Sequence, residues 1–169
     1  MAPSPAYSRG CDVLLTILRE SSFRFPVVKC QIIGTYSSAL TAVDERKRAI
    51  YYNEEFREVI VKALAMTARG QIQALKSYAD QVICFIDEPI LSAFGSSTYV
   101  AVRREDVVAL LRDMIDAVHA DGALAGIHCC ANTEWSILID AGVDIISFDA
   151  FQYGKAIAMY AEAVKAYLS

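Results

Sequence analysis

His128 and Cys130 are the two residues whose types and spacing best suit chemistry. They stand two positions apart near the end of an apolar run at residues 123–130. If that run is a β-strand, alternate side chains share a face, so these two project together while Cys129 points to the other side. An imidazole and a thiolate about 7 Å apart along a strand can converge on one divalent cation. We therefore expect a metal-ligand pair, with a buried histidine and cysteine as the alternative.

Acidic residues end two other apolar runs. Asp87 and Glu88 close the run at residues 81–88, where they lie on opposite faces and Pro89 stops the strand. Only one of the two can share a face with His128 and its neighbours. Asp149 ends the run at residues 143–149, on a face with Ser147, and Lys29 and Gln31 share one face of the run at residues 27–34 without an assigned role. The alternatives are an acidic cap or solvated turn for the Asp-Glu pair, and a helix cap for Asp149.

These runs belong to a pattern in which short apolar segments alternate with longer amphipathic ones. The expected strands are residues 27–34, 81–88, 123–130 and 143–149, and the expected helices are residues 54–78, 102–120, 133–141 and 153–168. We expect Asn53 and Asn132 to cap the first and third of these helices, and Gly70 to weaken the middle of the first, where it could kink or break. Such alternation is typical of βα units that build a parallel sheet in an α/β fold. The nearly continuous apolar character predicts strands that are covered on both faces. Four units suit either a small open sheet or half of an eight-unit barrel.

Composition limits the function classes. The chain has 169 residues, 55% of them hydrophobic, a formal net charge of −4 and five cysteines. This predicts one domain over residues 1–169, with a helical lead-in at residues 1–26. We find no basic stripe for nucleic acid, no apolar run of membrane-spanning length, no secretion signal and no Gly-rich phosphate motif. We therefore expect a cytoplasmic protein with free or metal-bound thiols and with no nucleic-acid or membrane partner.

Three segments resemble one enzyme superfamily. They are Cys-Phe-Ile-Asp-Glu-Pro-Ile-Leu at residues 84–91, His-Cys-Cys-Ala-Asn-Thr-Glu-Trp at residues 128–135, and Asp-Ile-Ile-Ser-Phe-Asp-Ala at residues 144–150. Their order and spacing are similar to those of cobalamin-independent methionine synthase and its relatives. That superfamily also includes uroporphyrinogen decarboxylase and corrinoid-dependent methyltransferases. The resemblance implies a partial (β/α)8 TIM-type barrel from about residue 27 onward.

The resemblance also implies an activity and a site. In the zinc methyltransferases of this family the matching His and Cys bind Zn²⁺, which activates the small thiol, such as homocysteine, that accepts the methyl group. His128 and Cys130 would then be zinc ligands. Asp87 or Glu88 would hold the ammonium group of the substrate, and Asp149 would lie near the metal as a further ligand. The sequence does not say whether a corrinoid or a folate donates the methyl group.

The resemblance covers only the middle of the family barrel and does not include its last cysteine ligand. We therefore expect a homo-oligomer, or a missing barrel half supplied from elsewhere. One alternative is a non-catalytic truncated barrel that acts as an oligomeric module. Another is a lyase like uroporphyrinogen decarboxylase, although no arginine-rich segment here resembles its carboxylate-binding residues.

Overall fold

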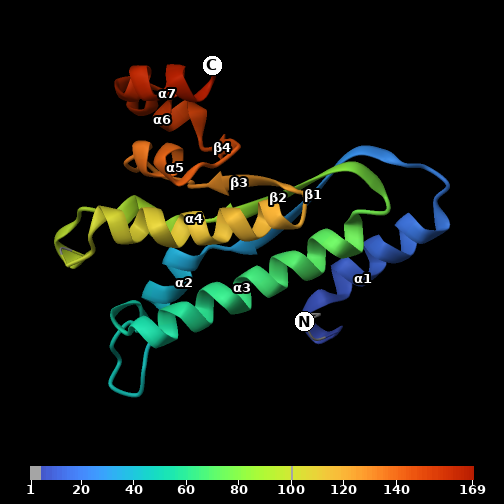
Figure 1. Cartoon of the computed structure of the whole chain (residues 1–169), viewed down its shortest axis with the longest axis horizontal. Helices are drawn as coiled ribbons and strands as arrows, with labels where there is room; N and C mark the ends of the chain where they lie inside the picture. Colours follow the sequence, from blue (N-terminus) through green and yellow to red (C-terminus); the bar gives the residue numbers. More distant parts are fainter. Residues whose placement is uncertain (1–4, 100) are drawn as a thin grey trace.

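Four parallel strands form the centre of the computed structural model, which describes residues 5–99 and 101–169 (Figure 1). The strands are β1 Phe25–Ile33, β2 Ala79–Asp87, β3 Leu124–His128 and β4 Ile145–Ser147. They lie in the order β1-β2-β3-β4, and each neighbouring pair is parallel. This confirms the predicted α/β fold with about four βα units in a parallel sheet.

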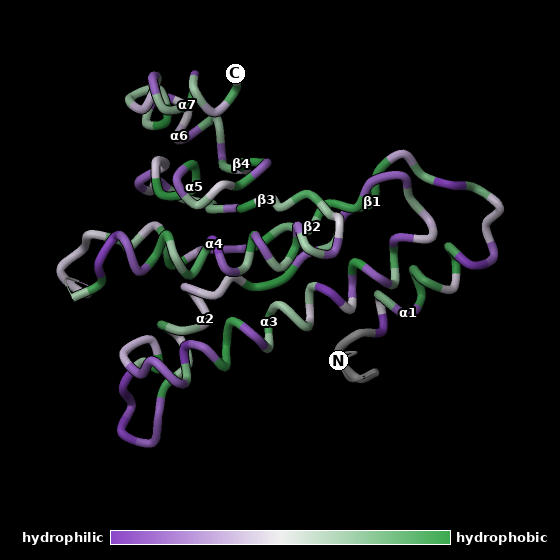
Figure 2. Tube along the Cα trace, in the orientation of Figure 1, coloured by the Kyte–Doolittle hydropathy of each residue, from purple (hydrophilic) through white to green (hydrophobic). Residues whose placement is uncertain are grey.

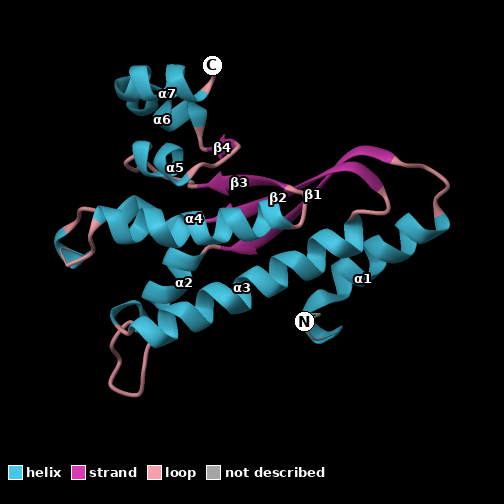
Figure 3. Cartoon of the chain, viewed as in Figure 1, coloured by secondary structure: helices cyan, strands magenta, loops and turns pink. Residues whose placement is uncertain are grey.

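Helices connect the strands (Figure 3). They are α1 Pro5–Glu20, α2 Thr35–Thr41, α3 Glu54–Leu75, α4 Arg104–Ala120, α5 Ser136–Ala141, α6 Ala150–Ile157 and α7 Ala161–Tyr167, with short 3₁₀ turns at Ile50–Tyr52, Pro89–Ala93, Ser97–Tyr99 and Ala158–Tyr160. The predicted helix start at Asn53 is confirmed, because its side chain accepts a hydrogen bond from the Phe56 amide at 3.2 Å. Helix α3 continues through Gly70, so the helix does not break there.

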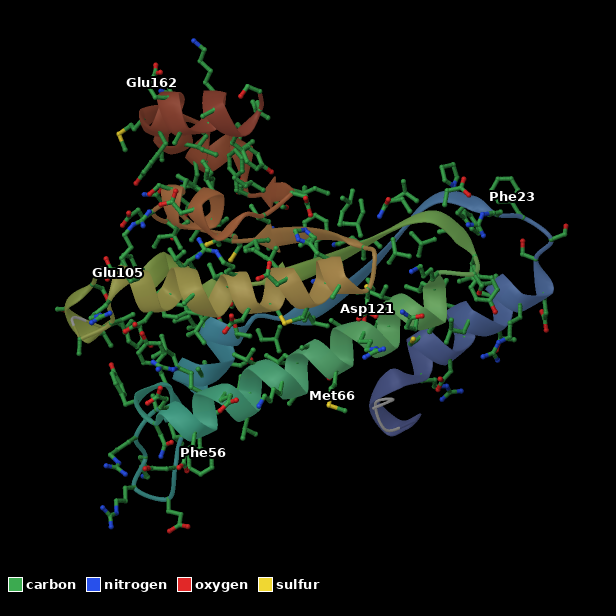
Figure 4. All side chains as sticks on the ribbon, viewed as in Figure 1. Phe23, Phe56, Met66, Glu105, Asp121 and Glu162 are labelled. Carbon is green, nitrogen blue, oxygen red and sulfur yellow. The ribbon has the colours of Figure 1, made fainter. Side chains whose placement is uncertain are left out.

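One face of the sheet is covered by helices. Helices α3 and α4 pack against the strands, and the strand side chains beneath them are buried. These are Cys30, Ile32, Val82, Cys84, Ile86, Ala125 and Ile127. The outer side of α3 faces solvent, where Phe56 and Met66 project from the molecule (Figure 4). In the hydropathy trace, the charged loop before α3 stands out as hydrophilic (Figure 2).

The other face of the sheet carries no helix in the described part of the chain. We call it the open face, and it presents Val27, Lys29, Gln31, Ile33, Ile83, Phe85, Asp87, Leu124, Gly126, His128, Ile145 and Ser147. The expectation that both faces are covered was therefore wrong for this face, where Val27 is 51% and Ile33 46% exposed. The sequence could not distinguish the covered face from the open face, because both carry apolar side chains.

Strand order and helix placement together distinguish the two architectures that the sequence left open. A doubly wound sheet reverses its strand order and has helices on both faces, whereas a barrel keeps sequential order with helices outside. Here the order is sequential and the helices lie on one face, so the arrangement is that of a partial barrel. Helices α6 and α7 lie beyond β4, on the far side of the sheet from α1 (Figure 1). None of the described helices is both long and apolar enough to cross a membrane.

Candidate functional site

A row of side chains crosses the open face where the strands end. The strand register places Ile33 beside Asp87, Asp87 beside His128, and His128 beside Ser147. All four strands therefore contribute to one row at their carboxyl ends. This is the edge at which parallel α/β folds bind ligands, because the connecting loops leave the backbone ends of several strands accessible there.

Hydrogen bonds connect Asp87 of this row to two further side chains on the open face. The Lys29 ammonium donates to Gln31 Oε1 at 2.8 Å, and the Gln31 amide donates in turn to Asp87 Oδ2. Lys29 also lies over the Phe85 ring, 4.4 Å from its centroid. The carboxylate, amide and ammonium groups thus form one connected set on β1 and β2. Sequence alternation placed Lys29 and Gln31 on one face, but gave no reason to assign them a role.

Gly126 allows the Phe85 ring to lie across the neighbouring strand. A Cβ atom on Gly126 would stand 2.9 Å from the ring, closer than side chains normally approach. Residue 126 must therefore be glycine for the Phe85 ring to occupy the space above β3. The ring forms an apolar floor between Lys29 and the end of β3, so the polar groups of the row surround a small apolar surface.

His128 has one ring nitrogen engaged by its neighbour. Its Nδ1 lies 3.0 Å from Ser147 Oγ. With the ring proton on Nδ1, the imidazole donates this bond and keeps Nε2 as an acceptor or metal ligand. The sequence placed Ser147 on a face with Asp149, but only the pairing of β3 with β4 reveals its contact with His128.

The two adjacent cysteines differ in environment. Cys129 is fully buried, and its thiol donates to the Ala131 carbonyl at 3.4 Å. Burial raises the pKa of Cys129, so this thiol stays protonated and inert. Cys130 is exposed just beyond the end of β3. The prediction that Cys129 points into packing is confirmed, and Cys130 is the accessible thiol of the two. The strand was predicted to reach residue 130 but ends at His128, so strand alternation does not extend to Cys130.

Asp87 and Glu88 are separated by the sheet. Asp87 lies on the open face, whereas Glu88 is fully buried at the start of α2. The Glu88 carboxylate accepts hydrogen bonds from the Tyr36 amide at 3.0 Å, the Ser37 amide at 2.8 Å and the Ser37 hydroxyl at 2.6 Å. Burial raises its pKa to about 7, although these hydrogen bonds act in the opposite direction. Glu88 thus holds the β1–α2 turn in place, and Asp87 is the acidic member of the row.

Asp149 begins α6. Its Oδ1 accepts from the Phe151 amide at 3.0 Å and from the Gln152 amide at 3.2 Å. This is the capping role that the sequence offered as the alternative. The hydrogen bonds found here for Asp149 link it to α6 and do not connect it to the row.

The donor types in the row suit zinc, which binds imidazole nitrogen and thiolate sulfur. His128 offers Nε2, and Cys130 offers an exposed thiol. Within the described residues, however, no group of three or more His, Cys, Asp and Glu side chains is gathered closely enough to hold a metal ion. His128 and Cys130 are thus two donors of the right kind, and Asp87 is the acidic neighbour of His128 in the row. Comparisons with protein-family models, with curated proteins and with solved structures found no match to this chain.

Proposed function

We propose that this chain contributes to a zinc-dependent methyltransferase similar to cobalamin-independent methionine synthase, which transfers a methyl group to a small thiol. The observation that supports this most directly is the corner at the end of β3. There His128 is oriented by Ser147, and the accessible Cys130 follows two residues later. An imidazole with its second nitrogen anchored is the usual form of a zinc-binding histidine.

The proposed roles follow from the positions of the side chains. His128 and Cys130 would hold zinc, and Asp87 would attract the ammonium group of an amino-acid thiol. Zinc held there would supply Lewis acidity, which favours the thiolate form of a bound thiol near neutral pH. Lys29 and Gln31 hold the Asp87 carboxylate through their chain of hydrogen bonds. A catalytic zinc normally has three protein ligands, so the proposal requires a third ligand from a chain that covers the open face.

A zinc titration of purified chain tests the proposal. We expect one zinc ion per site and at least a tenfold loss of affinity in His128→Ala and in Cys130→Ser. The matched controls are His119→Gln, whose histidine pairs with Asp144, and Cys11→Ser, which removes another exposed thiol. Equal zinc affinity in all four variants would contradict the assignment, as would zinc binding that is lost only in the controls.

A second reading, an oligomeric module without catalysis, is favoured by the open face itself. Edge strand β1 presents Val27 and Ile33 to solvent, and strand edges with apolar side chains promote association with another chain. In this alternative a second copy of the chain covers the open face, and the side chains of the polar row form contacts in the interface. The two readings differ in whether the chain binds zinc.

A further inference from the structure

Cys30 and Cys84 lie directly opposite each other on adjacent strands. They are register partners of β1 and β2 on the helix-covered face, 8% and 0% exposed. Neighbouring strands lie about 4.8 Å apart, within the range of roughly 4.4–6.8 Å that a disulfide spans between Cα atoms. The backbone therefore already holds these two thiols at a separation suited to a covalent bond.

The two thiols are also chemically unequal. The hydrogen bond with Cys84 lowers the pKa of Cys30, and the nearby Lys29 charge acts in the same direction. The same contact, together with burial, raises the pKa of Cys84. Cys30 is thus the sulfur with more thiolate character, and it is also the more exposed of the two. Cys129 is a buried cysteine without this arrangement, because it lies beyond the last register pair of β3.

We propose that Cys30 and Cys84 are a redox modification site, at which a peroxide forms a disulfide that ties β1 to β2. The Cys30 thiolate attacks one peroxide oxygen, the O–O bond breaks, and a sulfenic acid and water result. The Cys84 sulfur then attacks the Cys30 sulfur, so that the S–S bond forms and the S–O bond breaks with release of a second water. Two thiols and one hydrogen peroxide become one disulfide and two waters. A peroxide suits this site because it is small enough to reach a thiol that is only slightly exposed.

The proposed bond would lie on the opposite face of the sheet, three register positions before the Ile33–Asp87 pair of the polar row. Cys30 precedes Gln31, and Cys84 lies three residues before Asp87 on its strand. Oxidation would therefore fix β1 against β2 at the base of the hydrogen-bonded pair formed by Gln31 and Asp87. This proposal does not depend on zinc binding, because its atoms lie on the opposite face of the sheet.

Mass spectrometry of the folded chain tests whether peroxide forms the Cys30–Cys84 disulfide. In the variant Cys11→Ser/Cys129→Ala/Cys130→Ser, hydrogen peroxide should lower the intact mass by about 2 Da, for two lost hydrogens, and a reductant should restore it. Adding Cys30→Ala or Cys84→Ala to this variant should abolish the decrease in mass. Peptide mapping of the oxidised wild-type chain should find Cys30 linked to Cys84. Unlinked thiols, separate oxygen addition at each sulfur, or a link through Cys129 would overturn the proposal.

Thermal unfolding provides a second readout of the tie between the strands. A bond that closes the loop between residues 30 and 84 should raise the melting temperature of the oxidised variant by roughly 5–15 °C over its reduced form. The Cys84→Ala addition serves as the control, since peroxide should leave its melting temperature unchanged. A disulfide that forms without raising the melting temperature would contradict the role assigned to it.

Discussion

Single side chains at the ends of the strands determine what the open face can bind. His128 presents Nε2 because Ser147 occupies Nδ1, and Cys130 is accessible because the chain leaves the sheet after His128. The carboxylate of Asp87 is held from β1 by Gln31. Sequence alternation predicted which residues share a face. It did not predict the cross-strand contacts, because these depend on the register between strands that lie far apart in the sequence.

Ser147→Ala should weaken zinc binding without removing a ligand. Loss of the hydroxyl lets the imidazole rotate, and removal of such outer partners typically costs about 10–100-fold in metal affinity. A competition titration with a zinc chelator measures this. Ser92→Ala is the control, since that hydroxyl bonds only to the Pro89 carbonyl among the contacts found here. Equal zinc affinity in Ser147→Ala and in the wild type would show that Ser147 does not orient His128.

The buried Glu88 carboxyl group should make the free energy of unfolding depend on pH. Its pKa rises from an ordinary 4.5 to about 7 on folding, because the carboxyl group is buried. Between these values the folded chain holds a proton that the unfolded chain has released, so the free energy of unfolding falls as pH rises. The loss from Glu88 should amount to about 3 kcal/mol between pH 4.5 and pH 8.

Urea unfolding at pH 5 and at pH 8 measures this dependence. Glu88→Gln should remove most of it, because the amide does not titrate. Glu45→Gln, at an exposed position in the loop before α3, should keep it. A dependence that persists unchanged in Glu88→Gln would assign it to other groups.

At the scale of elements, the turn from β1 into α2 is built around the buried carboxylate. Gly34 has an ordinary φ of −79°, so the backbone conformation does not require glycine there. The limited space requires glycine instead, because a Cβ on Gly34 would lie 2.1 Å from Glu88 Oε1. The turn and the end of β2 therefore depend on each other.

Gly34→Ala should destabilise the chain by roughly 1–3 kcal/mol, since the new methyl group displaces Glu88 from its donors on Tyr36 and Ser37. Denaturant unfolding at pH 7 provides the measurement. Gly154→Ala in α6 is the matched control, because nothing lies within 4 Å of the added atom. If both substitutions changed the free energy of unfolding equally, the close packing at Gly34 would not matter.

The sequence predicted the existence and the type of the main elements better than their ends. The continuous apolar runs located every strand of the sheet, and Asn53 located the start of α3. The predicted cap at Asn132 was wrong, because α5 begins at Ser136 after Trp135. Tertiary contacts hold the preceding residues outside the helix. The Thr133 hydroxyl donates to the Leu91 carbonyl, and Arg104 pairs with Glu134.

At the scale of the whole molecule, the sheet formed by the described residues has one covered face, one open face and two edges to which no further described strand is paired. The predicted partial barrel is the architecture in which these features belong together, because the open face then lines an interior. Burial on both faces could not be judged from the sequence, since Phe85, Ile83 and Ile145 are as apolar as the side chains beneath the helices.

Association through the open face is testable in solution. We expect analytical ultracentrifugation to show concentration-dependent dimers, and Val27→Lys to weaken the dimer at least tenfold by placing a charge on the open face of the edge strand. The control is Val59→Lys, at a similarly exposed valine on α3. If Val59→Lys weakens association and Val27→Lys does not, α3 and not the open face is the interface.

Zinc X-ray absorption spectroscopy tests the central claim most directly. For the zinc-loaded chain the account predicts scattering from nitrogen at about 2.0 Å and sulfur at about 2.3 Å. Both contributions should be lost with His128→Ala/Cys130→Ser and kept with His119→Gln/Cys11→Ser. Addition of homocysteine should add one sulfur to the zinc shell, as expected for a thiol substrate activated by the metal. A shell without sulfur, or one that homocysteine leaves unchanged, would contradict the account.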